Sequence, residues 1–291
     1  MMKTTFSKSI FKMNRRQAIK ILSSGIAYVS IPNEVFAALR LLSSKSPHKE
    51  YDSHVRDYLF KIKNFDETNV QDLFLNKSKI PILKSSVNRF RKIQKLVGYG
   101  NFGLISMDDA IKTARQYSSV GPFRKKEIDF IEMIFYKDSS VYGFLGEKPL
   151  KNFTARLKTK KIVKISGSGH YLYEGKSLEK YNKIKKTIGD DVVLTSGLRS
   201  IPKQIALFLN KTIITDANLS KASRSLAPPG YSLHGIGDFD VGQKRFGVSN
   251  FSIEFTKTPV YEKLIKSGFA DFRYTENNNF GVRFEPWHIK V

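Results

Sequence analysis

The sequence SLHGIGDFD (residues 232–240) places one imidazole and two carboxylates within a single short segment. In a regular strand, residues of equal parity share a face, so His234 and either Asp238 or Asp240 could turn toward the same side. The glycines at positions 235 and 237 would let the backbone approach an ion closely. The segment therefore predicts a strand, residues 236–241, that carries part of a metal site.

The supply of possible metal ligands in this chain is small. The 291 residues include no cysteine, which excludes disulfides and cysteine-based zinc sites. Any metal must be held by histidine, aspartate or glutamate. The chain has five histidines: His48, His54, His170, His234 and His288. The first two lie in a polar stretch and are expected at the surface, whereas His170 is equally compatible with a structural role and a cleft.

A second segment, EPWH (residues 285–288), lies close to the C-terminus. A catalytic zinc needs about three protein ligands and one open position, and a neighbouring carboxylate can act as general base. On an ideal strand Glu285 and His288 would face opposite ways. Pro286 prevents a regular ladder, so a local kink could bring both to one site. Trp287, the only tryptophan, is expected to form a wall of that site.

The third segment is SGLRS (residues 196–200). Arg199 falls at a predicted strand-to-helix loop, where side chains commonly reach ligands. A guanidinium group can bind a terminal carboxylate through two hydrogen bonds. The three segments together predict a hydrolytic metal site with a carboxylate-binding arginine.

In order and content, the three motifs resemble the zinc D-alanyl-D-alanine carboxypeptidase family that includes the vancomycin-resistance carboxypeptidases. The resemblance covers roughly residues 155–291. It implies Zn²⁺ as cofactor, peptidoglycan stem peptides as substrate and a small α+β fold with an antiparallel sheet. It also implies roles for particular residues: metal ligands His234, Asp240 and His288; catalytic residues Glu285 and Arg199; and substrate-binding residues Arg199, Gln204, Ser232 and Trp287.

One departure from the family pattern concerns the carboxylate ligand. The family usually has one more residue between the first histidine and the aspartate than this chain has between His234 and Asp240. Asp240 fits the ligand position best because it lies between Phe239 and Val241, as in an apolar strand. Asp238 remains an alternative ligand.

The rest of the chain predicts a mostly helical region, residues 38–150, followed by an α+β catalytic domain, residues 151–291. A capping box at Ser106 indicates a helix to about Tyr117, and a second helix is expected after Pro122. The elements expected farther on are strand 160–165, helix 177–189, strand 192–194, a helix from Ser200, a loop at 215–231, strand 236–241, helix 259–268 and a hairpin over 272–291.

The first 37 residues are typical of an export signal. A basic stretch ends at Arg15-Arg16, an apolar run follows from Ile19 to Ile31, and Ala37 stands where a signal peptidase would cut. The arginine pair resembles a twin-arginine signal, although Asn14 replaces the usual serine or threonine. The apolar run is too short for a mature membrane span. We therefore expect a periplasmic or secreted protein; whether the signal is cleaved stays open.

The net charge of +24 indicates an anionic partner. With no arginine-rich tract or aromatic-basic motif, we expect the anionic cell wall rather than nucleic acid, although a generally lysine-rich surface is an equal alternative. The serine-type penicillin-binding enzymes are excluded because the chain lacks Lys-Thr-Gly. Two alternatives keep the predicted site: an endopeptidase that cuts other stem-peptide bonds, and a wall-binding protein without activity.

Overall fold

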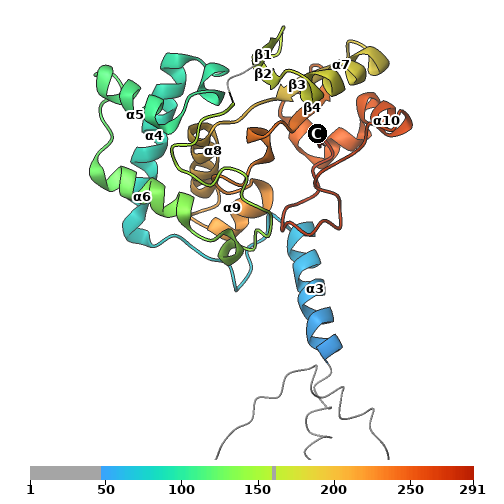
Figure 1. Cartoon of the computed structure of the whole chain (residues 1–291). Helices are drawn as coiled ribbons and strands as arrows, with labels where there is room; N and C mark the ends of the chain where they lie inside the picture. The colour runs from blue at the N-terminus through green and yellow to red at the C-terminus, as the bar shows by residue number, and fades with distance from the viewer. Residues whose placement is uncertain (1–46, 159–161) are drawn as a thin grey trace, which may run out of the picture. The chain divides into compact units, whose positions relative to one another are not determined.

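The computed structural model describes residues 47–158 and 162–291, with side chains from residue 55 onward. Residues 54–291 form one compact unit, and helix α3 (Pro47–Lys63) begins before it. Figure 1 shows the helices and strands of this unit. The predicted export signal and the side chains of His48 and His54 lie outside the described residues. Within the described ranges, no helix is both long enough and apolar enough to cross a membrane.

One part of the unit is helical and is built around α8 (Ile201–Ile214). Its neighbours are α4 (Ile80–Val97), α5 (Met107–Gln116) and α9 (Leu219–Ser225), and α6 (Lys125–Tyr136) packs against α4. Apolar residues recur every three or four positions on α4 and on α8, which gives each helix one buried face. These faces meet in a shared core that includes Val87, Phe90, Ile205, Phe208 and Leu209.

The other part is a three-stranded antiparallel sheet with the order β3 (Val192–Ser196), β4 (Phe239–Gln243) and β5 (His288–Ile289). Helices α7 (Lys176–Ile188) and α10 (Pro259–Lys266) pack beside it (Figure 1). A hairpin of β1 (Ile162–Ile165) and β2 (His170–Tyr173) forms a separate two-stranded sheet. The α+β class with small antiparallel sheets, preceded by a helical region, is therefore confirmed.

Most helices begin and end where the sequence predicts. Ser106 and Asp109 form the capping box of α5, and Gly189 is the C-cap of α7. The helix after Pro122 begins at Lys125. Ser177 does not cap α7, since Gly175 holds that position and the Ser177 hydroxyl donates to Gly237 O at 2.8 Å.

Three local predictions differ from the structure. The segment 215–231 contains helix α9, capped by the Asn218 side chain. Strand β4 begins only at Phe239, because Leu233–Gly235 forms a 3-10 turn. Residues 272–291 form only an irregular hairpin: one bridge, Phe272 to Ile289, and three backbone hydrogen bonds join 271–274 to 285–290, and β5 also pairs with β4.

The boundary proposed near residue 150 stays a prediction. The core around α8 contains side chains from both sides of it, such as Phe90 and Phe135 before it and Phe208 and Leu219 after it. The helical region therefore covers one face of the segment that carries Arg199.

Candidate active site

The sheet register places Asp240 directly opposite His288 on the neighbouring strand. Residues paired in this way project from the same face with Cβ atoms roughly 5 Å apart. Both side chains are buried, and His288 Nδ1 lies 3.2 Å from Asp240 Oδ1. The fold thus brings together two residues that are 48 positions apart in the sequence.

His234 reaches the same point from the 3-10 turn before β4. Its Nδ1 lies 2.8 Å from Gly197 O. A carbonyl oxygen only accepts, so Nδ1 carries the proton and Nε2 presents a lone pair. That Nε2 lies 3.3 Å from Asp240 Oδ1. Gly197 must be a glycine, since a Cβ there would lie 2.1 Å from Tyr171 O.

Asp238 turns away from this point and orients His288 from behind. Its Oδ2 lies 3.1 Å from His288 Nε2, and both of its oxygens accept from Arg273, at 2.9 and 3.1 Å. The backbone N–H of Val291 donates to Oδ1 at 3.0 Å. The backbone can turn here because Gly237 has a φ of +129°. With Nε2–H directed at Asp238, His288 offers Nδ1 to the opposite side.

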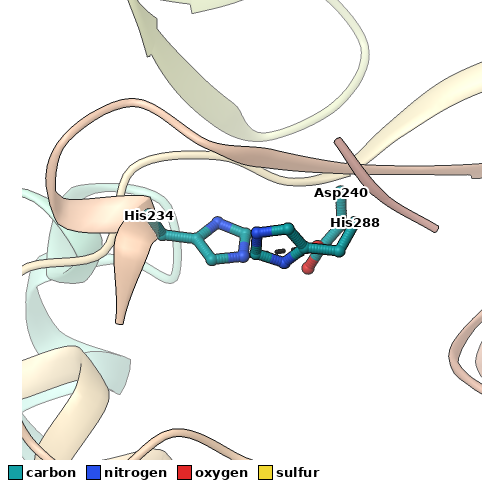
Figure 2. A group of neighbouring side chains, drawn as sticks. All are labelled: His234, Asp240 and His288. Atoms are coloured by element: carbon teal, nitrogen blue, oxygen red, sulfur yellow. Dashed lines mark ion pairs between the residues drawn. The ribbon is translucent and has the colours of Figure 1, made fainter. Parts of the chain in front are cut away.

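Three acceptor atoms therefore converge: His234 Nε2, an Asp240 oxygen and His288 Nδ1. The ligand atoms lie within 4.8 Å of one another and all three residues are buried (Figure 2). His234 Nε2 and Asp240 Oδ1 have no hydrogen-bond partner within the described residues. A lone pair facing a carboxylate oxygen in a buried site needs a cation between them, so this donor set fits a metal ion such as zinc.

The protonation of these side chains in the protein alone agrees with this geometry. Burial, followed by the charge of Arg199, lowers the pKa of His234 to about 4, so the ring stays neutral. Burial would also lower the pKa of His288, but the neighbouring carboxylates of Asp238 and Asp240 raise it to about 9. Burial would raise the pKa of Asp240, yet His234 and Arg199 hold it well below its usual range. In the protein alone, protonated His288 therefore carries a positive charge next to the ionised Asp240.

Glu285 lies beside the three acceptors, at the start of the tight turn that ends at His288. His288 N donates to Glu285 O at 3.1 Å, with Pro286 in the position of the turn that its fixed φ favours. The Glu285 side chain is 12% exposed, and its Oε2 lies 3.7 Å from His288 Nδ1. Burial raises the pKa of Glu285 to about 6. The predicted kink is therefore present, and it sets a carboxylate with a raised pKa next to the ligand group.

Arg199 lies on the opposite side of Asp240. Its Nη2 donates to Asp240 Oδ2 at 2.7 Å, and its Nε donates to Ser196 Oγ at 3.0 Å. The guanidinium holds the carboxylate so that Oδ1 faces the two histidines. Part of this arginine remains available to a ligand, because its side chain also lines the adjoining cleft.

The cleft has a volume of about 350 Å³. Asp240, Glu285 and Trp287 line it together with Arg199, and His170 lies at its edge from β2. Trp287 is 3% exposed and packs edge-on against Phe251. The predicted wall residue and base thus share one cavity with a predicted ligand.

Two predicted substrate contacts are not among the residues that line the cleft. Gln204 is buried, and its Nε2 donates to Ala227 O. Ser232 is buried at the start of the 3-10 turn that carries His234. Their role in substrate binding stays a prediction.

The sequence reasoning missed several residues of the site: Arg273 and Val291, which hold Asp238, and Lys203, Lys211 and Arg283, which line the cleft. Only the lysines left a signal in the sequence. Lys203 and Lys211 lie eight residues apart on α8, a spacing that places both on one side of the helix.

The family model VanY, D-alanyl-D-alanine carboxypeptidase, matches residues 174–291. No curated protein matches the chain. The matched region contains Arg199, the segment 232–240 and the segment 285–288, which are the motifs that suggested the resemblance. Residues 174–291 of this chain are therefore similar to the D-alanyl-D-alanine carboxypeptidase family.

Proposed function

We propose that this protein is an exported zinc carboxypeptidase that removes the terminal D-alanine from peptidoglycan stem peptides. The family match supports the carboxypeptidase activity. The single observation that carries the zinc proposal is the convergence of three buried acceptor atoms, two of which lack hydrogen-bond partners. Export rests on residues 1–37, with their Arg15-Arg16 pair and apolar run.

In this proposal His234 Nε2, an Asp240 oxygen and His288 Nδ1 hold the zinc ion. When bound there, zinc supplies Lewis-acid activation of a water molecule and of the peptide carbonyl. The chain itself supplies the orientation of the ligands, through Gly197 O on His234 and Asp238 on His288.

Glu285 is the proposed general acid–base. Its raised pKa of about 6 lets it take a proton from the attacking water near neutral pH and pass that proton to the leaving amine. The carboxylate lies next to the ligand group, where such a transfer needs no long movement.

Arg199 has two proposed roles. It fixes Asp240 through Nη2, and its remaining donors can bind the terminal carboxylate of the peptide. A terminal carboxylate is the feature that separates a carboxypeptidase substrate from an internal bond. A cation next to the ligand group therefore favours cleavage of the last peptide bond.

Defined stem peptides would test the proposal. The purified protein should bind about one zinc per chain, lose activity to a chelator and regain it with zinc. Mass analysis of the products should show free alanine from pentapeptides. Halved cross-linked dimers without free alanine would support the endopeptidase instead. Hydrolysis by metal-free protein would overturn the zinc mechanism, and wall binding without any hydrolysis would overturn the enzyme.

A further inference from the structure

The cleft next to the proposed zinc ligands contains more cations than the reaction uses. Four cationic side chains line it: Arg199, Lys203, Lys211 and Arg283. The carboxylates on the same wall are Asp240 and Glu285. Asp240 is already paired with Arg199 at 2.7 Å. The cleft therefore keeps a surplus of positive charge.

Helix α8 spaces two of these cations regularly. Lys203, Leu207 and Lys211 follow one another at intervals of four residues, so they lie on one face of the helix. All three are half-buried and line the cleft. At about 1.5 Å per residue, the backbone positions of the two lysines are about 12 Å apart. The helix thus presents positive charge at two separate points of one cavity.

Neither lysine lies within salt-bridge distance of a carboxylate in the part of the chain that the structure describes. Burial, with Arg199 as a second cause, lowers the pKa of Lys203 to about 8. Burial, followed by Arg283, also lowers the pKa of Lys211. Lys203 Nζ lies 5.8 Å from the ring centre of Phe102, and Asp66 acts on Lys211 from beyond salt-bridge distance. Neither contact pairs the cation with a carboxylate, and a partly buried cation without a paired carboxylate is unfavourable. A bound anion would offset that cost through charge-assisted hydrogen bonds.

Arg283 adds a fixed cation to the cleft. Its guanidinium lies 4.6 Å from the ring centre of Phe65 and 5.0 Å from that of Trp287. Its Nη2 donates to Phe251 O at 2.9 Å. Its Nε is buried and has no hydrogen-bond partner among the described residues. Two aromatic contacts and one hydrogen bond hold this side chain in place, while its buried Nε–H stays unused.

We propose that the cleft binds peptides that carry two free carboxylates. The terminal carboxylate lies at Arg199 and Lys203, beside the ligand group, and this half rests on the proposed function. The second carboxylate lies at Lys211 and Arg283. An extended peptide rises about 3.3 Å per residue, so 12 Å corresponds to about four residues, or fewer when a side chain carries the acid.

Four synthetic peptides ending in X-D-Ala-D-Ala test the proposal. X is glutamate or glutamine, and the C-terminus is a free acid or an amide. Binding is measured by calorimetry to full-length zinc-loaded protein with Glu285→Gln, which prevents turnover. The glutamate peptides should bind about tenfold more tightly than the glutamine peptides. Lys211→Gln should remove this preference and leave the acid-over-amide preference intact.

Further variants separate the two points of the cleft. Lys203→Gln should weaken the acid-over-amide preference and leave the glutamate preference. Lys211→Arg should restore the preference that Lys211→Gln loses. Lys186→Gln is the matched control, because it removes the same positive charge from an exposed position on α7 outside the cleft. It should keep both preferences.

Two results would overturn the inference: equal binding of the glutamate and glutamine peptides, or the same loss in Lys186→Gln as in Lys211→Gln. Activity of the unmodified protein is measured separately on the free-acid peptides. Both binding preferences without any cleavage would reject the proposed function and keep the second carboxylate subsite. Cleavage without a glutamate preference would support the proposed function and reject the second carboxylate subsite.

Discussion

Asp238 Oδ2 lies 3.1 Å from His288 Nε2, on the side of the imidazole that faces away from Asp240. The two aspartates therefore lie on opposite sides of the same ring, although a single residue separates them in the sequence. Arg273 and Val291 N occupy the remaining acceptor positions of Asp238. This arrangement supports Asp240 as the proposed zinc ligand and gives Asp238 the orientation of His288.

The two aspartates should respond differently to the same substitution. Asp240→Asn should lose most bound zinc, because three ligands become two and a weak amide oxygen. Asp238→Asn should keep the metal with an affinity about 10–100-fold lower, as expected when a residue that orients a histidine ligand is altered. Competition with a fluorescent chelator measures both affinities. Metal loss in Asp238→Asn with retention in Asp240→Asn would reverse the assignment.

The sequence identified the residue types of the site but not their separation in space. The equal parity of His234, Asp238 and Asp240 suggested one strand face. The structure instead has a 3-10 turn before Phe239, which removes the parity argument for His234 and Asp238. The pairing of Asp240 with His288 depends on a strand register between distant segments, and no local pattern encodes that register.

Local signals were sufficient where a helix depends on its own ends. The Ser106 capping box and the glycine after Ile188 set their boundaries without help from distant residues. The final hairpin is irregular, and His288 and Ile289 also pair with β4, a distant partner that the local pattern did not reveal. The shared core around α8 was equally hidden, since it joins residues more than 100 positions apart.

Glu285→Gln should separate catalysis from metal binding. Zinc should stay, because His234, Asp240 and His288 remain. The rate should fall by about 10²–10⁴-fold, since the proton acceptor and donor is lost. His288→Ala is the comparison and should lose zinc together with activity. Metal analysis and alanine release on the same preparations decide this; full activity in Glu285→Gln would remove Glu285 from the mechanism.

The region before residue 150 should be required for folding. A fragment of residues 151–291 would expose Ile205, Phe208 and Leu209, which are fully buried against the helical region. At about 1.5–3 kcal/mol for each buried side chain, these three alone represent roughly 5–9 kcal/mol. That amount is comparable to the stability of a whole domain, which is about 5–15 kcal/mol. Calorimetry should show no cooperative unfolding of the fragment. A transition like that of residues 38–291 would contradict this prediction.

A buried ion pair joins the same two regions and should make stability depend on pH. Asp72 accepts from Arg224 at 2.7 and 3.0 Å, and their side chains are 3% and 5% exposed. Burial would raise the pKa of Asp72, but hydrogen bonds from Arg224, Asn69 N and Asn218 outweigh it and lower the pKa. The folded state therefore binds this proton less readily than the unfolded state.

The sign of the effect follows from this lowered pKa. The pair contributes its full stability above about pH 4, the ordinary range of an aspartate, and loses it as the pH falls toward the folded pKa. Asp72→Asn should cost about 3–5 kcal/mol at pH 7, because Arg224 stays buried without its charge partner. This cost should shrink as the pH approaches about 3. The control is Asp129→Asn, since the Asp129–Lys125 pair is exposed and screened by solvent, so its loss should change the stability little at any of these pH values. Urea unfolding of both variants between pH 3 and 7 measures these differences, and a pH-independent cost of Asp72→Asn would show that the ion pair does not set the acid sensitivity.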